Sequence, residues 1–152
     1  MHVSAKSDYA LRALIEIAQD EGASPLSAEA IGNEQDIPHQ YLQSILADLR
    51  RAGIVRSQRG QGGGWLLARD RDAISVADVM RAVDGPLVSV HGVRPESVTY
   101  LPDARVLQTV WIAARGALRG VLESTTLAHL AAAELPAPVT QLSADKDAWQ
   151  AH

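Results

Sequence analysis

Residues 57–67 read SQRGQGGGWLL, and this glycine-rich stretch decides the fold class. A segment that carries Arg56 precedes it, and the apolar residues Trp65, Leu66 and Leu67 end it. Glycines permit a left-handed backbone and close approach of two chains, so the pattern predicts a β-hairpin with a positively charged tip. Such a hairpin next to a helix-turn-helix forms a winged helix, and winged helices mostly bind DNA.

A helix-turn-helix pattern lies directly before the hairpin. Ser27 is a good N-cap for a short helix whose inward residues are expected to be Ala30 and Ile31. Pro38 suits the opening turn of a second helix, which runs to about Ala52. The apolar stripe of this second helix consists of Leu42, Ile45, Leu46 and Leu49. Its opposite face is polar, as in helices that lie in a groove of a duplex.

Helical periodicity also appears on both sides of this motif. It covers residues 4–21, where Gly22 is the expected stop, and residues 75–83, which Gly85 ends. Together with the hairpin, these segments predict a winged helix-turn-helix DNA-binding domain over residues 1–86.

Residues 87–103 interrupt the helical pattern with prolines and scattered polar groups, and they predict an irregular loop. A long helix follows, from Pro102 or Asp103 to about Ser124. Its apolar stripe resembles a heptad seam and needs a partner, for which a second copy of the chain is the natural choice. The expected dimer interface consists of Leu107, Val110, Trp111, Ala114, Leu118, Val121 and Leu122.

The fold class predicted from these segments is mainly α with a small β-hairpin. A short helix over 126–133 is expected to pack back and complete a dimerisation segment at 104–134, and residues 135–152 are expected to form a flexible tail. The core has to be aliphatic, because hydrophobic residues make up 47% of the chain, aromatic residues only 4%, and Phe is absent.

Charge is distributed unevenly along the chain. The formal net charge of −4 counts against a generic nucleic-acid binder. Residues 37–71, however, contain six arginines and two aspartates, a local charge of +4 that attracts phosphate. We find no apolar run of membrane-spanning length and no signal-peptide pattern, so the chain is expected in the cytoplasm and away from membranes.

Several kinds of chemistry are excluded by composition and spacing. The chain has no cysteine, which excludes disulfides, thiolate nucleophiles and cysteine-ligated metals. His91 and His129 do not have the spacing of metal ligands, so neither a metal nor any other cofactor is expected. We find no nucleophile–base pair, and the glycine-rich stretch joins two strands instead of preceding a helix. An enzyme is therefore not expected.

Four segments carry a specific combination of motifs, including RGxGGG in the hairpin, AVDGP after the next helix and TTLAHL near the end. They are SAKSDYALRALIEIA (4–18), IPHQYLQSILADLRRAGIVRSQRGQGGGWLLAR (37–69), ISVADVMRAVDGP (74–86) and VLQTVWIAARGALRGVLESTTLAHL (106–130). Over roughly residues 1–133 the chain resembles the Rrf2 family of bacterial transcription regulators. The resemblance implies a homodimer that binds a pseudo-palindromic operator in double-stranded DNA. We expect the chain to act as a repressor.

One feature of the family is missing from this chain. Many members hold an iron–sulfur cluster through three cysteines in the loop before the dimerisation helix, and some add a carboxylate at the position of Asp8. Here that loop reads SVHGVRPESVTYLPDARV (89–106) and contains no cysteine. The chain therefore resembles the cluster-free members, and its signal is expected to be a small molecule or a partner protein.

The resemblance assigns DNA contacts to the polar face of the second helix and to the hairpin. Glutamine can bond an adenine edge through both amide groups, and an arginine suits a narrow A·T-rich minor groove. For Tyr41, a core or phosphate contact is an equal alternative. The expected DNA-binding residues are Pro38, His39, Gln40, Tyr41, Gln43, Ser44, Arg50, Arg51, Arg56, Ser57, Arg59, Gly60, Gln61, Gly62 and Lys6.

The sequence is consistent with an effector site and with a second function. We call residues 87–103 the sensor-type loop. Arg94, Tyr100, Arg105, Trp111 and Arg115 cluster around it and could receive an anionic effector, although a core Trp111 among surface arginines is the more common arrangement. The alternative function is a protein-interaction adaptor that uses the winged helix or the long helix to bind a partner protein.

Overall fold

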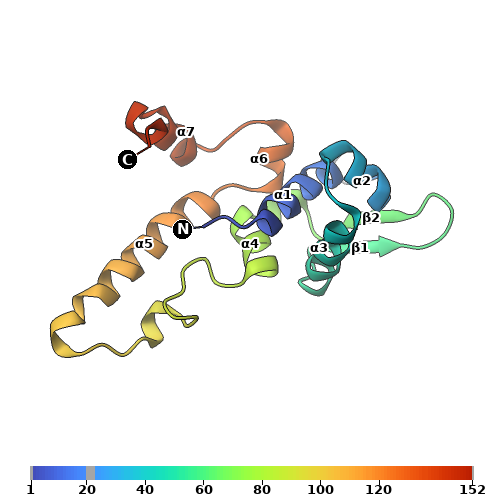
Figure 1. Ribbon diagram of the computed structural model, residues 1–152. Helices are drawn as coiled ribbons and strands as arrows, with labels where there is room; N and C mark the ends of the chain where they lie inside the picture. Colours follow the sequence, from blue (N-terminus) through green and yellow to red (C-terminus); the bar gives the residue numbers. More distant parts are fainter. Residues whose placement is uncertain (1, 20–22, 152) are drawn as a thin grey trace.

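The computed structural model describes residues 2–19 and 23–151, and in this part of the chain every regular element except one hairpin is helical. The predicted fold class is confirmed. The N-terminal part contains α1 (Ala5–Ala18), α2 (Ala28–Gln35), α3 (His39–Arg51), β1 (Val55–Gln58), β2 (Gly64–Leu67), the 3-10 turn η2 (Arg71–Ala73) and α4 (Val76–Asp84). These elements gather around one core, from which the hairpin projects (Figure 1).

Side-chain caps fix where the helices of this domain begin. The Ser27 hydroxyl accepts a hydrogen bond from the Ala30 amide (3.0 Å), which confirms the predicted N-cap of α2. Ser75 and Asp78 form a reciprocal capping box at the start of α4. The expected stop at Gly22 lies outside the described residues.

The core follows the predicted apolar stripe of α3, all of whose members are fully buried: Leu42, Ile45, Leu46 and Leu49. Ile31 of α2 is also buried, but Ala30 is exposed, so its predicted inward position is wrong. Ala28, three residues before Ile31 and therefore on the same face, packs against the core instead.

The hairpin is anchored to the connector before α2. Val55 pairs with Leu67 and Gln58 with Gly64 in an antiparallel register. Leu26 and Trp65 exchange two backbone hydrogen bonds of 3.0 and 2.7 Å, and this isolated antiparallel bridge ties the connector to β2. A Cβ at Gly64 would lie 2.5 Å from the Leu26 backbone, so only glycine fits there.

The C-terminal part begins with the sensor-type loop, which contains the 3-10 turns η3 (Pro95–Ser97) and η4 (Pro102–Ala104). Because η4 occupies the predicted start of the long helix, α5 spans only Val106–Leu122. α5 extends away from the core on the side opposite the hairpin (Figure 1), and the side chain of Gln108 ties it to η3 through the Pro95 carbonyl (3.1 Å).

The chain then returns to the core through α6 (Leu127–Ala132), whose Leu127 is fully buried. Residues 137–149, in the segment expected to be a flexible tail, contain α7 (Ala137–Ala144) and the 3-10 turn η5 (Lys146–Trp149), and their flexibility stays a prediction. Among the described residues, no helix combines the length and apolarity needed to cross a bilayer.

Candidate nucleic-acid interface

The polar face of α3 is exposed along its first two turns. Pro38 serves as the N-cap residue, and the other side chains of this face reach solvent: His39, Gln40, Gln43 and Ser44. The ring Nε2 of His39 lies 3.4 Å from the Gln43 amide nitrogen, one helical turn away. The face therefore presents amide and hydroxyl groups suited to base edges.

Tyr41 lies on the surface beside this face. Its side chain is 56% exposed, so it is not a core residue. Its ring packs edge-on against Tyr9 of α1, with ring centroids 6.1 Å apart, and the Arg12 guanidinium lies over the Tyr9 ring. This contact fixes the orientation of α3 relative to the start of α1.

Two of the expected phosphate-binding cations are held by a carboxylate. Lys6 of α1 and Arg51 of α3 both form ion pairs with Asp48. The hydrogen bond from Lys6 is the main cause that lowers the pKa of Asp48 below its usual value, and Arg51 adds to the effect. Arg50 is exposed. Lys6 and Arg51 can thus bind a phosphate only in competition with Asp48.

We expect Asp48→Asn to tighten DNA binding about threefold to tenfold at low salt, because it leaves both cations free for phosphates. Gel shifts at several salt concentrations measure the change, which should shrink as salt rises. Asp36→Asn is the matched control, since it removes the same charge from an exposed carboxylate at the C-cap of α2 that forms no ion pair with a described residue. Equal tightening by both variants would rule out the release of Lys6 and Arg51 as the cause.

The tip of the hairpin is a tight glycine turn that leaves its polar side chains in solvent. The Gly63 amide donates to the Gly60 carbonyl (3.0 Å), and Gly60 and Gly62 have φ of 97° and 73°. The predicted contact residues of the hairpin are all exposed: Arg56, Ser57, Arg59, Gly60, Gln61 and Gly62. The hairpin follows α3 directly, and the Ile54 amide donates to the Leu49 carbonyl (2.9 Å). The hairpin is therefore held next to the end of α3, and both elements carry exposed polar side chains.

Two arginines that the sequence analysis did not select lie at the base of the hairpin. Arg69 and Arg71 line a cavity of about 470 Å³ together with Arg56, Asp70 and Asp72. Arg71 is partly committed to the fold, because it donates to the Ala18 carbonyl (3.3 Å). Their place in the basic segment 37–71 was the signal that could have found them.

The five residues expected to form an effector site are divided by the structure. Arg94 and Arg115 line a cavity of about 480 Å³ between α4, α5 and the sensor-type loop. Tyr100 and Trp111 instead bond to each other, the indole nitrogen donating to the phenol oxygen (3.1 Å). Arg105 is exposed and does not line the cavity.

The apolar residues of α5 are also divided. Leu107 and Val110 are 40% and 49% exposed, and Ala114 is exposed as well. The others of the predicted interface are half-buried within the protomer: Trp111, Leu118, Val121 and Leu122. Val106 and Ile112, which lie outside the predicted stripe, are 67% and 40% exposed. A long helix thus presents a row of uncovered apolar side chains.

Comparison with known proteins gives consistent matches over most of the chain. Residues 3–133 match the model of the Rrf2 family, described as an iron-dependent transcriptional regulator. A Mycobacterium tuberculosis protein named as an HTH-type transcriptional regulator is 42% identical over 145 residues, which cover 95% of this chain and 90% of that protein. The HTH-type transcriptional regulator CymR of Bacillus subtilis is 37% identical over 131 residues, or 86% of this chain and 90% of CymR.

Solved structures agree with these matches. The structure of CymR, the global cysteine regulator of B. subtilis, aligns with a TM-score of 0.73 at 34% identity and covers 88% of this chain and 98% of that one. The structure of IscR from T. potens aligns with a TM-score of 0.67 at 30% identity and covers 100% of this chain and 93% of that one.

The donor groups of this chain do not fit the iron–sulfur cluster that the resemblance described above implies for many family members. The sequence contains no cysteine to supply thiolates. Within residues 2–19 and 23–151, no group of three or more histidine and carboxylate side chains is placed to hold a metal ion.

Proposed function

We propose that this chain, which belongs to the Rrf2 family of transcriptional regulators, binds a pseudo-palindromic operator as a homodimer and represses transcription. The observation that carries the proposal is that the hairpin lies beside α3 at one end of the molecule (Figure 1), and that the polar side chains of both are exposed. This arrangement joins a polar helix face to an arginine-tipped turn, which are the two parts that a winged helix uses on DNA.

In this proposal the two parts enter successive grooves of the duplex. Gln40, Gln43 and Ser44 of α3 read base edges in the major groove. Arg59 enters the adjacent minor groove, where its guanidinium is attracted by the negative potential of A·T-rich DNA. Arg50, Arg56, Ser57 and the amides of the glycine turn hold phosphates and fix the register.

The homodimer forms through the uncovered apolar face of α5. Leu107, Val110 and their neighbours expose apolar surface to water in a single protomer. A two-fold axis along α5 would place the same face of a second copy against it, so that each copy covers the other. Two copies of the α3 and hairpin surface then face two half-sites, which explains why the operator should be a pseudo-palindrome. A dimer on a promoter blocks polymerase by occupancy alone, so repression needs no further contact.

The signal in this proposal is a small molecule or a partner protein that acts on the part of the chain between α4 and α5. That segment holds the sensor-type loop, and four of the five charged side chains that line its cavity are arginines. Guanidinium groups recognise carboxylates and phosphates.

The proposal is tested by selecting bound fragments from genomic DNA of the source organism with the purified chain. Binding of the selected fragment should fall steeply with salt, by about a thousandfold or more between ~50 and ~200 mM, because each neutralised phosphate releases counterions. Gel shifts across this range measure the fall. If no fragment shifts even at low salt, the proposal fails and the alternative of a protein-binding adaptor gains support.

A further inference from the structure

The cavity between α4, α5 and the sensor-type loop has an unusual concentration of positive charge. Four guanidinium groups and one carboxylate line its volume of about 480 Å³, and the remaining lining comes from the turn after α4. The guanidiniums belong to Arg81, Arg94, Arg115 and Arg119, and the carboxylate belongs to Glu96. Volumes of this size are typical of small-molecule sites.

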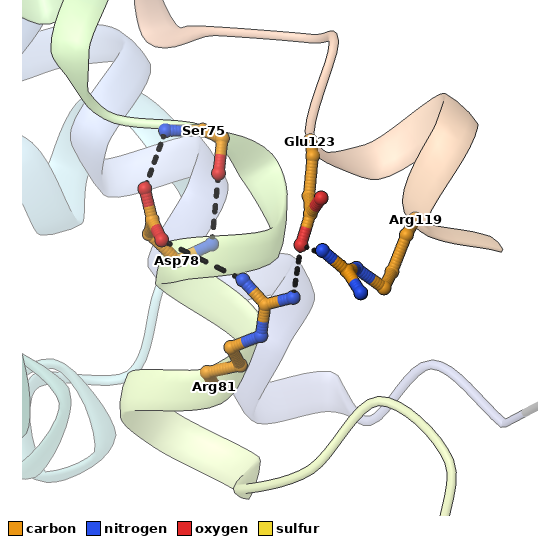
Figure 2. Close-up of polar contacts among 5 residues, drawn as sticks. All are labelled: Ser75, Asp78, Arg81, Arg119 and Glu123. Atoms are coloured by element: carbon orange, nitrogen blue, oxygen red, sulfur yellow. Dashed lines mark hydrogen bonds and ion pairs between the residues drawn. The ribbon is translucent and has the colours of Figure 1, made fainter. Parts of the chain in front are cut away.

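Carboxylates of the chain itself neutralise part of this charge. Arg115 of α5 pairs with Glu96 of the loop at 2.6 Å. Glu123, just after α5, accepts from Arg119 at 2.9 Å and also pairs with Arg81 of α4, as Figure 2 shows. The hydrogen bond from Arg119 is the main cause that lowers the pKa of Glu123 below its usual value, and the bond from Arg81 adds to it. Glu123 is therefore an ionised bridge between α4 and α5.

Two arginines around the cavity keep hydrogen-bond donors that no described residue uses. The Arg94 guanidinium makes no hydrogen bond or ion pair with a described residue. The pKa of Glu96 is lowered mainly by a backbone hydrogen bond and by the hydrogen bond from Arg115, and the nearby charge of Arg94 adds to this effect. Arg119 uses its Nε nitrogen on Glu123, so its two terminal nitrogens have no described partner. The site can thus accept more negative charge than the chain supplies.

We infer that this cavity binds a small anion with two or more carboxylate or phosphate groups, and that this anion is the effector. Such a ligand matches paired guanidiniums, each of which can bond two oxygens at once. It also competes with Glu123 for Arg81 and Arg119. This part of the inference rests on the proposed function, because the ligand would loosen the tie between the DNA-binding helices and α5 and so alter the spacing of the two hairpins.

The cavity itself is tested on the full chain without DNA, by isothermal titration calorimetry with citrate and with pyrophosphate at matched ionic strength. We expect one of the two to bind, which also decides between carboxylate and phosphate chemistry. Arg94→Gln should weaken that binding about tenfold or more, since it removes a charged donor that makes no hydrogen bond or ion pair with a described residue. Arg105→Gln, an exposed arginine outside the cavity, should leave it unchanged.

Three results overturn the inference about the cavity: neither anion binds at about 10 mM, Arg94→Gln binds as tightly as the unmodified chain, or Arg105→Gln is equally weakened. The regulatory part is tested by adding the bound anion to gel shifts of the selected DNA fragment. We expect the affinity for DNA to change at least about threefold in the unmodified chain and not in Arg94→Gln. If the anion leaves the affinity for DNA unchanged, only the regulatory part of the inference is overturned. If the chain binds no DNA at all, the proposed function fails, and calorimetry still shows whether the cavity binds the anion.

Discussion

Replacing Arg59 with alanine is expected to weaken operator binding about a hundredfold, the largest loss of any single change in the hairpin. A dimer loses this contact twice, and each base or groove contact by an arginine is worth about 1–3 kcal/mol. The side chain is exposed and makes no hydrogen bond or ion pair with a described residue, so the fold should be unaffected. Fluorescence anisotropy with the selected fragment measures the loss.

The loss should depend on the DNA sequence at the hairpin. Arg59 gains most from a narrow A·T-rich minor groove, so exchanging the flanks for G·C pairs should reduce the difference between Arg59→Ala and the unmodified chain. Arg105→Ala, which removes the same charge at the opposite end of the molecule, is the control. Unchanged affinity of Arg59→Ala on A·T-rich flanks would contradict the minor-groove role of the hairpin.

Introducing a charge at Val110 is expected to abolish the dimer and, with it, operator binding. Val110→Glu places two carboxylates against each other near the two-fold axis of a desolvated interface, at an expected cost above about 4 kcal/mol, or roughly a thousandfold in dimer affinity. Because Val110 is 49% exposed in the protomer, the protomer should still fold. Sedimentation velocity and gel shifts measure the two effects.

A matched control is available in the sensor-type loop. Val93 is 46% exposed, nearly the same as Val110, and lies outside α5. Val93→Glu makes the same chemical change and should leave both the dimer and operator binding intact. If Val110→Glu sediments as a dimer with normal affinity, the α5 interface is wrong and another face has to join the two copies.

Much of the winged helix could be predicted from the sequence because its signals are local. The stripe of α3 from Leu42 to Leu49 repeats at the helical period, and the N-cap of α2 follows from the single residue Ser27. The glycines of the hairpin predict a tight turn from the sequence alone. In each case the residues that decide the structure lie within a few positions of one another.

The candidate site depended more on contacts between distant segments, which periodicity does not reveal. Glu123 meets Arg81 across 42 positions, and this pairing brings Arg81 to a cavity that the sequence analysis assigned to the loop and α5 alone. Lys6 was expected on a phosphate, but Asp48 of α3 lies close enough to bind it. Part of the apolar stripe of α5 packs against its own protomer, and the rest is exposed and available to a second copy. The sequence does not show which residues belong to which group.

Hydroxyl-radical footprinting of the purified full chain on its selected fragment tests the central claim most directly. The account predicts two protected half-sites related by a two-fold axis, with centres about 10 base pairs apart or a multiple of that spacing. Protection of the flanking minor grooves should disappear in Arg59→Ala. A single asymmetric footprint, or flanking protection that survives in Arg59→Ala, would contradict a dimer that reads DNA through α3 and the hairpin.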